Sequence, residues 1–193
     1  MIRLPRPWLL LALLAACASA PKESYYTLNA QAPTATQAPG PLADAGITVV
    51  ATGLVEAVDR PQIVARLSDT RVEILEQQRW AEPLRAAIPR VVASNLSRML
   101  GSTRVSSQSQ APLGETAYRV ALDVQRFDST PGEGAAIEVA WSVRRVAGNV
   151  VKSGRSSVTE RASGPGYDAL AAAHSRALAS VSRDIAQTLR EMQ

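Results

Sequence analysis

The feature that most constrains the fold is a series of three long segments between residues 118 and 159, the first two of which alternate apolar and polar side chains. The apolar positions of the first two segments are Tyr118, Val120, Leu122, Val124, Ile137, Val139, Trp141 and Val143. A period of two gives a β-strand one apolar and one polar face. A tight turn at 147–149 precedes the third segment, which we expect over 149–159. The pattern therefore predicts an antiparallel meander with a single apolar face.

Two further segments carry apolar residues at the spacing of an α-helix, and we expect helices over residues 82–100 and 168–192. Pro89 lacks the amide hydrogen that a helix interior uses, so it predicts a kink or a split in the first helix. The sole histidine, His174, lies on the apolar stripe of the second helix.

Shorter strands are expected at 47–50 and 103–107, and a hairpin at 63–67 and 71–75. A sheet with one apolar face needs a cover, which two amphipathic helices can supply. We therefore predict the α+β class, as a two-layer sandwich whose mostly antiparallel sheet is covered on one face by two helices. The expected order is β-strands, α, β-meander, α.

The N-terminal segment is typical of an export signal. Arg3 and Arg6 precede an uninterrupted apolar run over residues 8–16, which as a helix would span roughly 14 Å, about half of a bilayer core. Leu14-Ala15-Ala16-Cys17 is similar to the lipobox of bacterial lipoproteins, where the cysteine thiol takes a diacylglyceryl group and the chain is cut just before it. Cys17 is the only cysteine of the chain. The alternative is an ordinary secretory signal with a chance cysteine.

These observations divide the chain into a signal peptide at 1–16, a lipidated N-terminus with a flexible Ala/Pro-rich tether at 17–45, and an α+β domain at 46–193. Within the tether, residues 29–45 carry a single charge and no apolar periodicity. Such a tether would let the domain stand away from the lipid, unless the tyrosine segment at 25–28 pairs with the domain. Ala18 follows the cysteine, and by analogy with enterobacterial sorting it favours the outer membrane.

The composition and motifs argue against catalysis and nucleic-acid binding. Two of the 21 basic residues lie in the signal, so the rest nearly balance the 17 acidic residues, and they form no cluster interleaved with aromatic residues. His174 has no second histidine or cysteine to share a metal, which favours a core-edge or interface side chain. The sequence also lacks Gly-x-Ser-x-Gly and Gly-rich phosphate motifs. We predict no enzyme, no metal and no cofactor beyond the covalent lipid.

Two segments, residues 59–66 and 79–84, suggest an interaction module. Trp80 is interpreted either as a staple that packs the start of the helix onto the sheet or as a partner contact, because Trp and Arg are favoured interface anchors. Arg60 and Arg66 are either solvated or ion-paired, or they contact a partner. The candidate partner-binding residues are Tyr25, Tyr26, Arg60, Gln62, Arg66, Trp80 and Glu82.

Four motifs in this order resemble the PqiC-type (paraquat-inducible protein C) family, also described as the auxiliary lipoprotein of ABC-type transporters. They are the lipobox, Tyr25-Tyr26-Thr27-Leu28, Arg60-Pro61-Gln62-Ile63-Val64 and Arg79-Trp80-Ala81-Glu82-Pro83-Leu84. The resemblance implies an outer-membrane lipoprotein that works with a periplasm-spanning MCE-domain protein and an inner-membrane transporter component. It also implies lipid movement between membranes, a role in envelope integrity and a ring-like homo-oligomer.

Two other functions remain open beside docking of a lipid transport system. One is a lipid carrier that holds an acyl chain between sheet and helices, although aromatic residues make up only 4% and the apolar positions are used by sheet–helix packing. The other is a structural envelope lipoprotein without a transport role.

Overall fold

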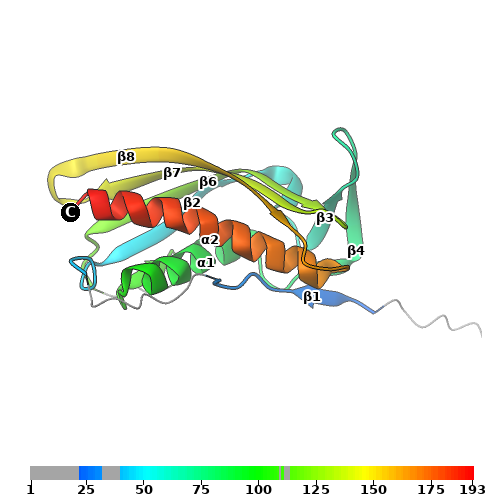
Figure 1. The fold of residues 1–193 in the computed structure, drawn as a ribbon, viewed down its shortest axis with the longest axis horizontal. Helices are drawn as coiled ribbons and strands as arrows, with labels where there is room; N and C mark the ends of the chain where they lie inside the picture. Colours follow the sequence, from blue (N-terminus) through cyan, green and yellow to red (C-terminus); the bar gives the residue numbers. More distant parts are fainter. Residues whose placement is uncertain (1–21, 32–39, 109, 111–113) are drawn as a thin grey trace, which may run out of the picture.

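The computed structural model describes residues 22–31, 40–108, 110 and 114–193. Two helices, α1 (Leu84–Leu100) and α2 (Tyr167–Glu191), lie on one face of a twisted sheet (Figure 1). The strands of the described part are β1 (Ser24–Tyr26), β2 (Ile47–Leu54), β3 (Gln62–Arg66), β4 (Val72–Trp80), β5 (Val105–Ser107), β6 (Tyr118–Thr130), β7 (Gly134–Arg145) and β8 (Val150–Arg161). Two short 3-10 turns are η2 (Glu56–Val58) and η3 (Ala147–Asn149). The predicted fold class is confirmed.

The sheet is built around β6, which pairs along its length with β7 in antiparallel orientation. Strand β8 continues this meander beyond β7. On its other edge β6 is joined in parallel by β2 and, at one residue, by β3. Strand β3 forms an antiparallel hairpin with β4, and β1 and β5 add short parallel pairs to β4 and β2. The long meander makes the sheet mostly antiparallel.

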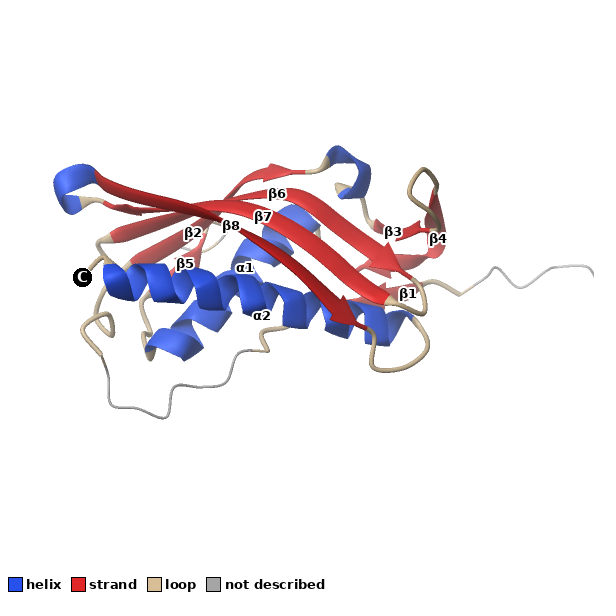
Figure 2. Cartoon of the chain, turned by 45° about the horizontal axis from the view of Figure 1, so that its top comes forward, coloured by secondary structure: helices blue, strands red, loops and turns tan. Residues whose placement is uncertain are grey.

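The core lies between the sheet and the helices, and Figure 2 shows both helices beneath the same face. Helix α2 packs on β7 and β8, and α1 packs on β2 and β5. The predicted alternation supplies this core, since Val120, Leu122, Val139 and Val143 are at most 1% exposed. Each such side chain, once buried, adds about 1.5–3 kcal/mol of apolar transfer free energy.

Strand β6 continues beyond the end of the sequence pattern because a bulge resets its register. The pairing with β7 shifts between Val124 and Arg126, so one residue is inserted on β6. Phe127 then returns to the buried face, where it is 2% exposed. The alternation breaks at the bulge, and this is why the sequence predicted a shorter strand.

Helix α1 runs as one helix through Pro89, so the predicted split is wrong. Pro89 is buried and lies in the second turn, where it cannot donate the backbone hydrogen bond to the carbonyl of Arg85. The αL conformation of Gly101, with φ of 64°, ends the helix as its position predicted.

Parts of the predicted tether belong to the folded domain. Ser24–Tyr26 forms β1, and Leu28 and Leu42 are 1% and 4% exposed in the core. The α+β domain therefore includes residues before the predicted boundary at 46, because backbone pairing with β4 and two buried leucines hold them in place. The signal segment and Cys17 lie outside the described residues.

Candidate functional site

The structure gathers the candidate partner-binding residues around β1, β3 and β4, at the end of the sheet away from the C-terminus (Figure 1). They divide between two faces of the sheet. We call the face opposite the helices the outer face and the face under the helices the inner face. Tyr25, Gln62 and Arg66 lie on the outer face, whereas Tyr26 and Trp80 lie on the inner face.

On the outer face, Arg79 of β4 is opposite both Tyr25 of β1 and Gln62 of β3. Its Nη2 lies 3.0 Å from Glu23 Oε1, and the Tyr25 hydroxyl donates to the same carboxylate. The hydrogen bond to Glu23, together with the charge of Glu23, raises the pKa of Tyr25. Tyr25 is nevertheless 60% exposed, so this polar row leaves an accessible aromatic side chain at the sheet edge.

Trp80 is a core residue. It is 5% exposed, and its ring meets those of Phe127 and His174 edge-on at 6.0 Å and 5.8 Å between centroids. This supports the interpretation that Trp80 packs the β4–α1 connection onto the sheet, rather than contacting a partner.

Tyr26 is also committed to internal contacts. Its hydroxyl donates to Gln78 Oε1 at 2.6 Å, and its ring meets Tyr167 of α2 edge-on at 6.1 Å.

Glu82 forms an ion pair with Arg90 of α1. The Nη2 of Arg90 also donates to the carbonyl of Leu28 at 3.0 Å. Glu82 therefore positions the guanidinium that holds the N-terminal segment against α1.

The segment 28–31, which we call the strap, is held by side chains of both helices. Beyond Leu28, the amide of Asn29 donates to Ser175 Oγ at 3.1 Å and that of Gln31 to Asn95 Oδ1 at 3.0 Å. The carbonyl of Ala30 accepts from Arg98 at 3.2 Å. Asn95 and Ser175 are buried, at 0% and 1% exposure. The sequence analysis missed both residues; their only signal is a polar side chain within an apolar helix face.

Arg66 forms an ion pair with Asp128 of β6, 2.8 Å from Nε to Oδ2, and Arg126 contacts the same carboxylate. Burial alone would raise the pKa of Asp128, but the hydrogen bonds from Arg66 and Arg126 outweigh it and hold that pKa below its usual value. The ion-paired interpretation of Arg66 is supported. Arg60 lies in the turn before β3, and its Nε is buried without a hydrogen-bond partner among the described residues.

His174 is fully buried, and burial lowers its pKa to about 3. Its Nε2 lies 2.8 Å from Ser129 Oγ, and its Nδ1 has no hydrogen-bond partner in the described part of the chain. It is therefore a neutral core side chain rather than an acid or base open to solvent. Within the described ranges, no group of three His, Cys, Asp or Glu residues could hold a metal ion. None of the described helices is long and apolar enough to cross a membrane.

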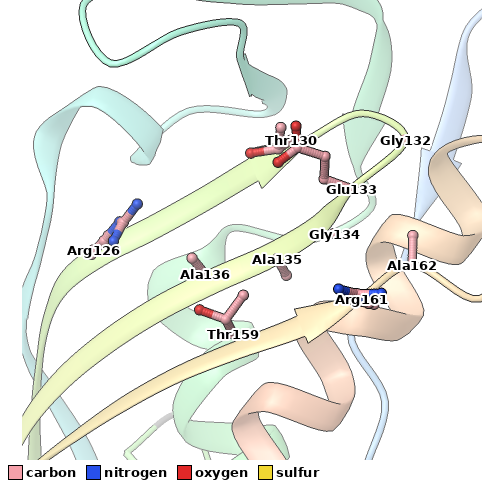
Figure 3. A pocket seen from close by; sticks show the side chains of 10 residues that line it. All are labelled: Arg126, Thr130, Gly132, Glu133, Gly134, Ala135, Ala136, Thr159, Arg161 and Ala162. Carbon is pink, nitrogen blue, oxygen red and sulfur yellow. The ribbon is translucent and has the colours of Figure 1, made fainter.

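The outer face carries a pocket of about 650 Å³ near the ends of β6, β7 and β8 (Figure 3). Small side chains such as Ala136 and Thr159 form its floor, and Arg126, Glu133 and Arg161 surround it. A site surrounded by charged side chains suits a polar protein surface better than an acyl chain.

Comparison with known proteins gives a family and a fold. The model of the ABC-type transport auxiliary lipoprotein component family matches residues 26–186. No curated protein matches the chain. A crystal structure of an uncharacterized protein is 20% identical, with a TM-score of 0.66 over 87% of this chain and 99% of that one. The DUF330 protein XCC0632 from Xanthomonas campestris is 18% identical, with a TM-score of 0.64 over 88% of this chain and 100% of that one.

Proposed function

This chain belongs to the family of ABC-type transport auxiliary lipoprotein components, and from that membership we propose a non-catalytic docking lipoprotein for an MCE-type lipid transport system. In this proposal Cys17 carries the lipid, and the domain lies on the periplasmic face of the outer membrane. There it supports a periplasm-spanning MCE-domain protein. A separate inner-membrane transporter component drives transport. Together these proteins would move lipids between the two membranes and so keep the cell envelope intact.

The observation that carries the docking role is the uncovered outer face of the long meander. Strands β6, β7 and β8 have 12 to 13 residues each, and both helices lie on their other face. Ala136 lines the pocket described above, and Ala121 and Ala140 line a second hollow over the middle of β6 and β7. These small side chains allow close approach of a partner. Charged residues around the hollows would give such an interface specificity.

The proposal is tested by purifying the lipidated full chain in mild detergent from its own membranes. We expect the MCE-domain protein and an inner-membrane component to co-purify. The variant Ala136→Arg fills the outer-face pocket and should abolish co-purification while the domain stays folded. The matched control is Gln187→Arg, which adds the same side chain at an exposed position of α2. If neither variant changes the partners recovered, the outer face is not the docking surface.

The anchor and the assembly are tested separately. Cys17→Ser should leave the chain unprocessed or remove it from the outer-membrane fraction, and an unchanged location and function would refute the anchor. We further propose that the anchored chain forms a homo-oligomer, which the mass of the detergent-solubilised protein will test.

A lipid-carrier function is less well supported, because the space between sheet and helices is filled. Leu122, Ile137, Val181 and Ile185 meet there at 0–1% exposure. Stoichiometric lipid bound to the purified domain would favour the carrier function over docking. A chain that recovers neither lipid nor a transport protein would favour a purely structural envelope role.

A further inference from the structure

We propose that the tip of the β3–β4 hairpin, formed by Leu67, Val72 and Ile74, inserts into the interfacial layer of the bilayer that holds the lipid anchor. The domain would then rest against the membrane instead of standing away from it. This inference rests on the lipidation of Cys17 in the proposed function.

The hairpin tip exposes apolar side chains on both of its faces. Leu67, Val72 and Ile74 are 43%, 47% and 40% exposed. Because side chains alternate along a strand, Val72 and Ile74 share one face with Val64, and Leu67 lies on the other. In the described part of the chain, the backbone of the hairpin pairs with β6 at Ala65↔Ser129 alone, and the ion pair between Arg66 and Asp128 adds a side-chain contact. The tip beyond Arg66 therefore projects from the sheet (Figure 1). Clustered exposed apolar side chains mark surfaces that contact another protein or a membrane.

The position of β1 brings the anchor within reach of this tip. Strand β1 begins at Ser24, seven positions after Cys17, so the two Cα atoms lie at most about 25 Å apart. Ser24 is opposite Gln78 in a parallel pair, which directs the preceding chain toward the first residues of β4. Val72 lies six positions before Gln78, and the register of β4 against β3 is interrupted at 76–78, so the two Cα atoms are at most about 20 Å apart. The lipid on Cys17 can therefore lie level with the hairpin tip.

A similar apolar patch at the other end of the sheet lies much farther from the anchor. Val146, Val150 and Val151 are 56%, 39% and 49% exposed around η3, beside the C-terminus (Figure 1). Strand β8, with 12 residues, places them roughly 40 Å from the anchored end. Of the two patches, the hairpin tip is therefore the one that lies near the anchor.

The charges at the tip indicate how it would bind. The tip carries two negatively charged residues, Asp69 and Glu73, and one positively charged residue, Arg71, so it has no excess of positive charge. The contact would therefore depend on apolar insertion, which amphipathic surface segments make about 5–10 Å deep, and not on attraction to anionic lipid.

The test uses the full chain lipidated at Cys17, whose acylated thiol does not react with a label. Val72→Cys carries an environment-sensitive fluorophore, and Val151→Cys is the matched control because its exposure, 49% against 47%, is nearly equal. Both are reconstituted in phosphatidylethanolamine–phosphatidylglycerol vesicles that contain nitroxide-labelled lipid. We expect a blue shift and several-fold stronger quenching at position 72 than at position 151, unchanged by salt or by the phosphatidylglycerol fraction.

Three outcomes overturn the inference. Equal quenching at both positions contradicts it. A blue shift at position 72 that appears only when the chain dimerises, or only when the MCE-domain protein is added, also contradicts it. Quenching that disappears in high salt contradicts the apolar mode of contact. If Cys17 is acylated and the transport proteins still co-purify in these cases, the proposed function stands and only the membrane contact fails. A chain without acyl groups at Cys17 refutes the anchor itself.

Discussion

The imidazole of His174 lies parallel to the phenyl ring of Phe127, with 4.0 Å between ring centroids and 9° between planes. Trp80 closes the same cluster edge-on. An ionisable ring thus forms part of the aromatic centre that joins α2, β4 and β6. Protonation of His174 would place a positive charge where no solvent can reach it, so the core carries a built-in dependence on pH.

The stability of the domain should fall as the pH drops below about 6.5. Burial lowers the pKa of folded His174 from 6.5 to about 3, so between these values the unfolded chain binds a proton that the folded chain does not. The free energy of unfolding then decreases by up to about 1.4 kcal/mol per pH unit. Urea unfolding at about pH 7.5 and about pH 5 should differ by roughly 2 kcal/mol.

The control for this prediction is His174→Gln, which should lose the difference between the two pH values. Asp128 also has a lowered pKa, but its contribution is lost only below its ordinary value of 3.8, outside this window. A histidine-independent slope of the same size would contradict the assignment to His174.

Trp80→Ala should destabilise the domain by about 3–5 kcal/mol, because it leaves a cavity beside Phe127 and His174. Thermal unfolding followed by far-UV circular dichroism measures this loss. Tyr25→Ala, at a 60% exposed position, should change stability by less than about 0.5 kcal/mol. A well-folded Trp80→Ala domain of unchanged stability would return Trp80 to the set of partner contacts.

Gly154→Ala should strain the β7–β8 pair. A Cβ at position 154 would lie 2.4 Å from Cζ2 of Trp141, so the indole must move and its 3.0 Å hydrogen bond to Ser156 is lost. We expect a loss of about 1–3 kcal/mol and a changed near-UV circular dichroism spectrum. Ser153→Ala, one residue earlier and exposed on the same strand, is the control. An unaltered spectrum in Gly154→Ala would mean that Trp141 has space to adjust.

Ser175→Ala should release one amide of the strap. The Asn29 amide donates to Ser175 Oγ, and a hydrogen bond of about 1 kcal/mol corresponds to roughly five- to tenfold faster amide exchange when it is lost. Hydrogen–deuterium exchange of the peptide that covers residues 28–31 measures the effect. Ser180→Ala on the same helix should leave that exchange unchanged. Equal exchange in both variants would show that the strap is held mainly by its other contacts.

Strands β6 and β7 and both helices could be predicted because their apolar residues follow a simple period. The period identifies which face of each element is buried, and this fixes a two-layer arrangement. The bulge after Val124 ended the readable pattern early, because one inserted residue shifts every later side chain to the other face. Pairing between distant strands, such as β1 with β4, leaves no periodic trace in either segment.

The candidate site could be predicted only in part. Tyr25, Tyr26, Trp80 and Glu82 were found as a group, but their separation into outer and inner faces depends on strand register. The sequence predicts a flexible tether at the strap because the composition there is typical of a linker. Its order comes from side chains more than 60 positions away, such as Asn95, that bind its backbone, and such contacts do not depend on the identity of the strap residues.

The docking of β1 has a mechanical consequence. If Cys17 carries a lipid as proposed, a pull on that lipid along the axis of β1 would load the hydrogen bonds between β1 and β4 in shear, so that they must break together rather than one after another. The strap would share that load through both helices. Force on the lipid would therefore be transmitted to the interior of the domain instead of only extending a flexible linker.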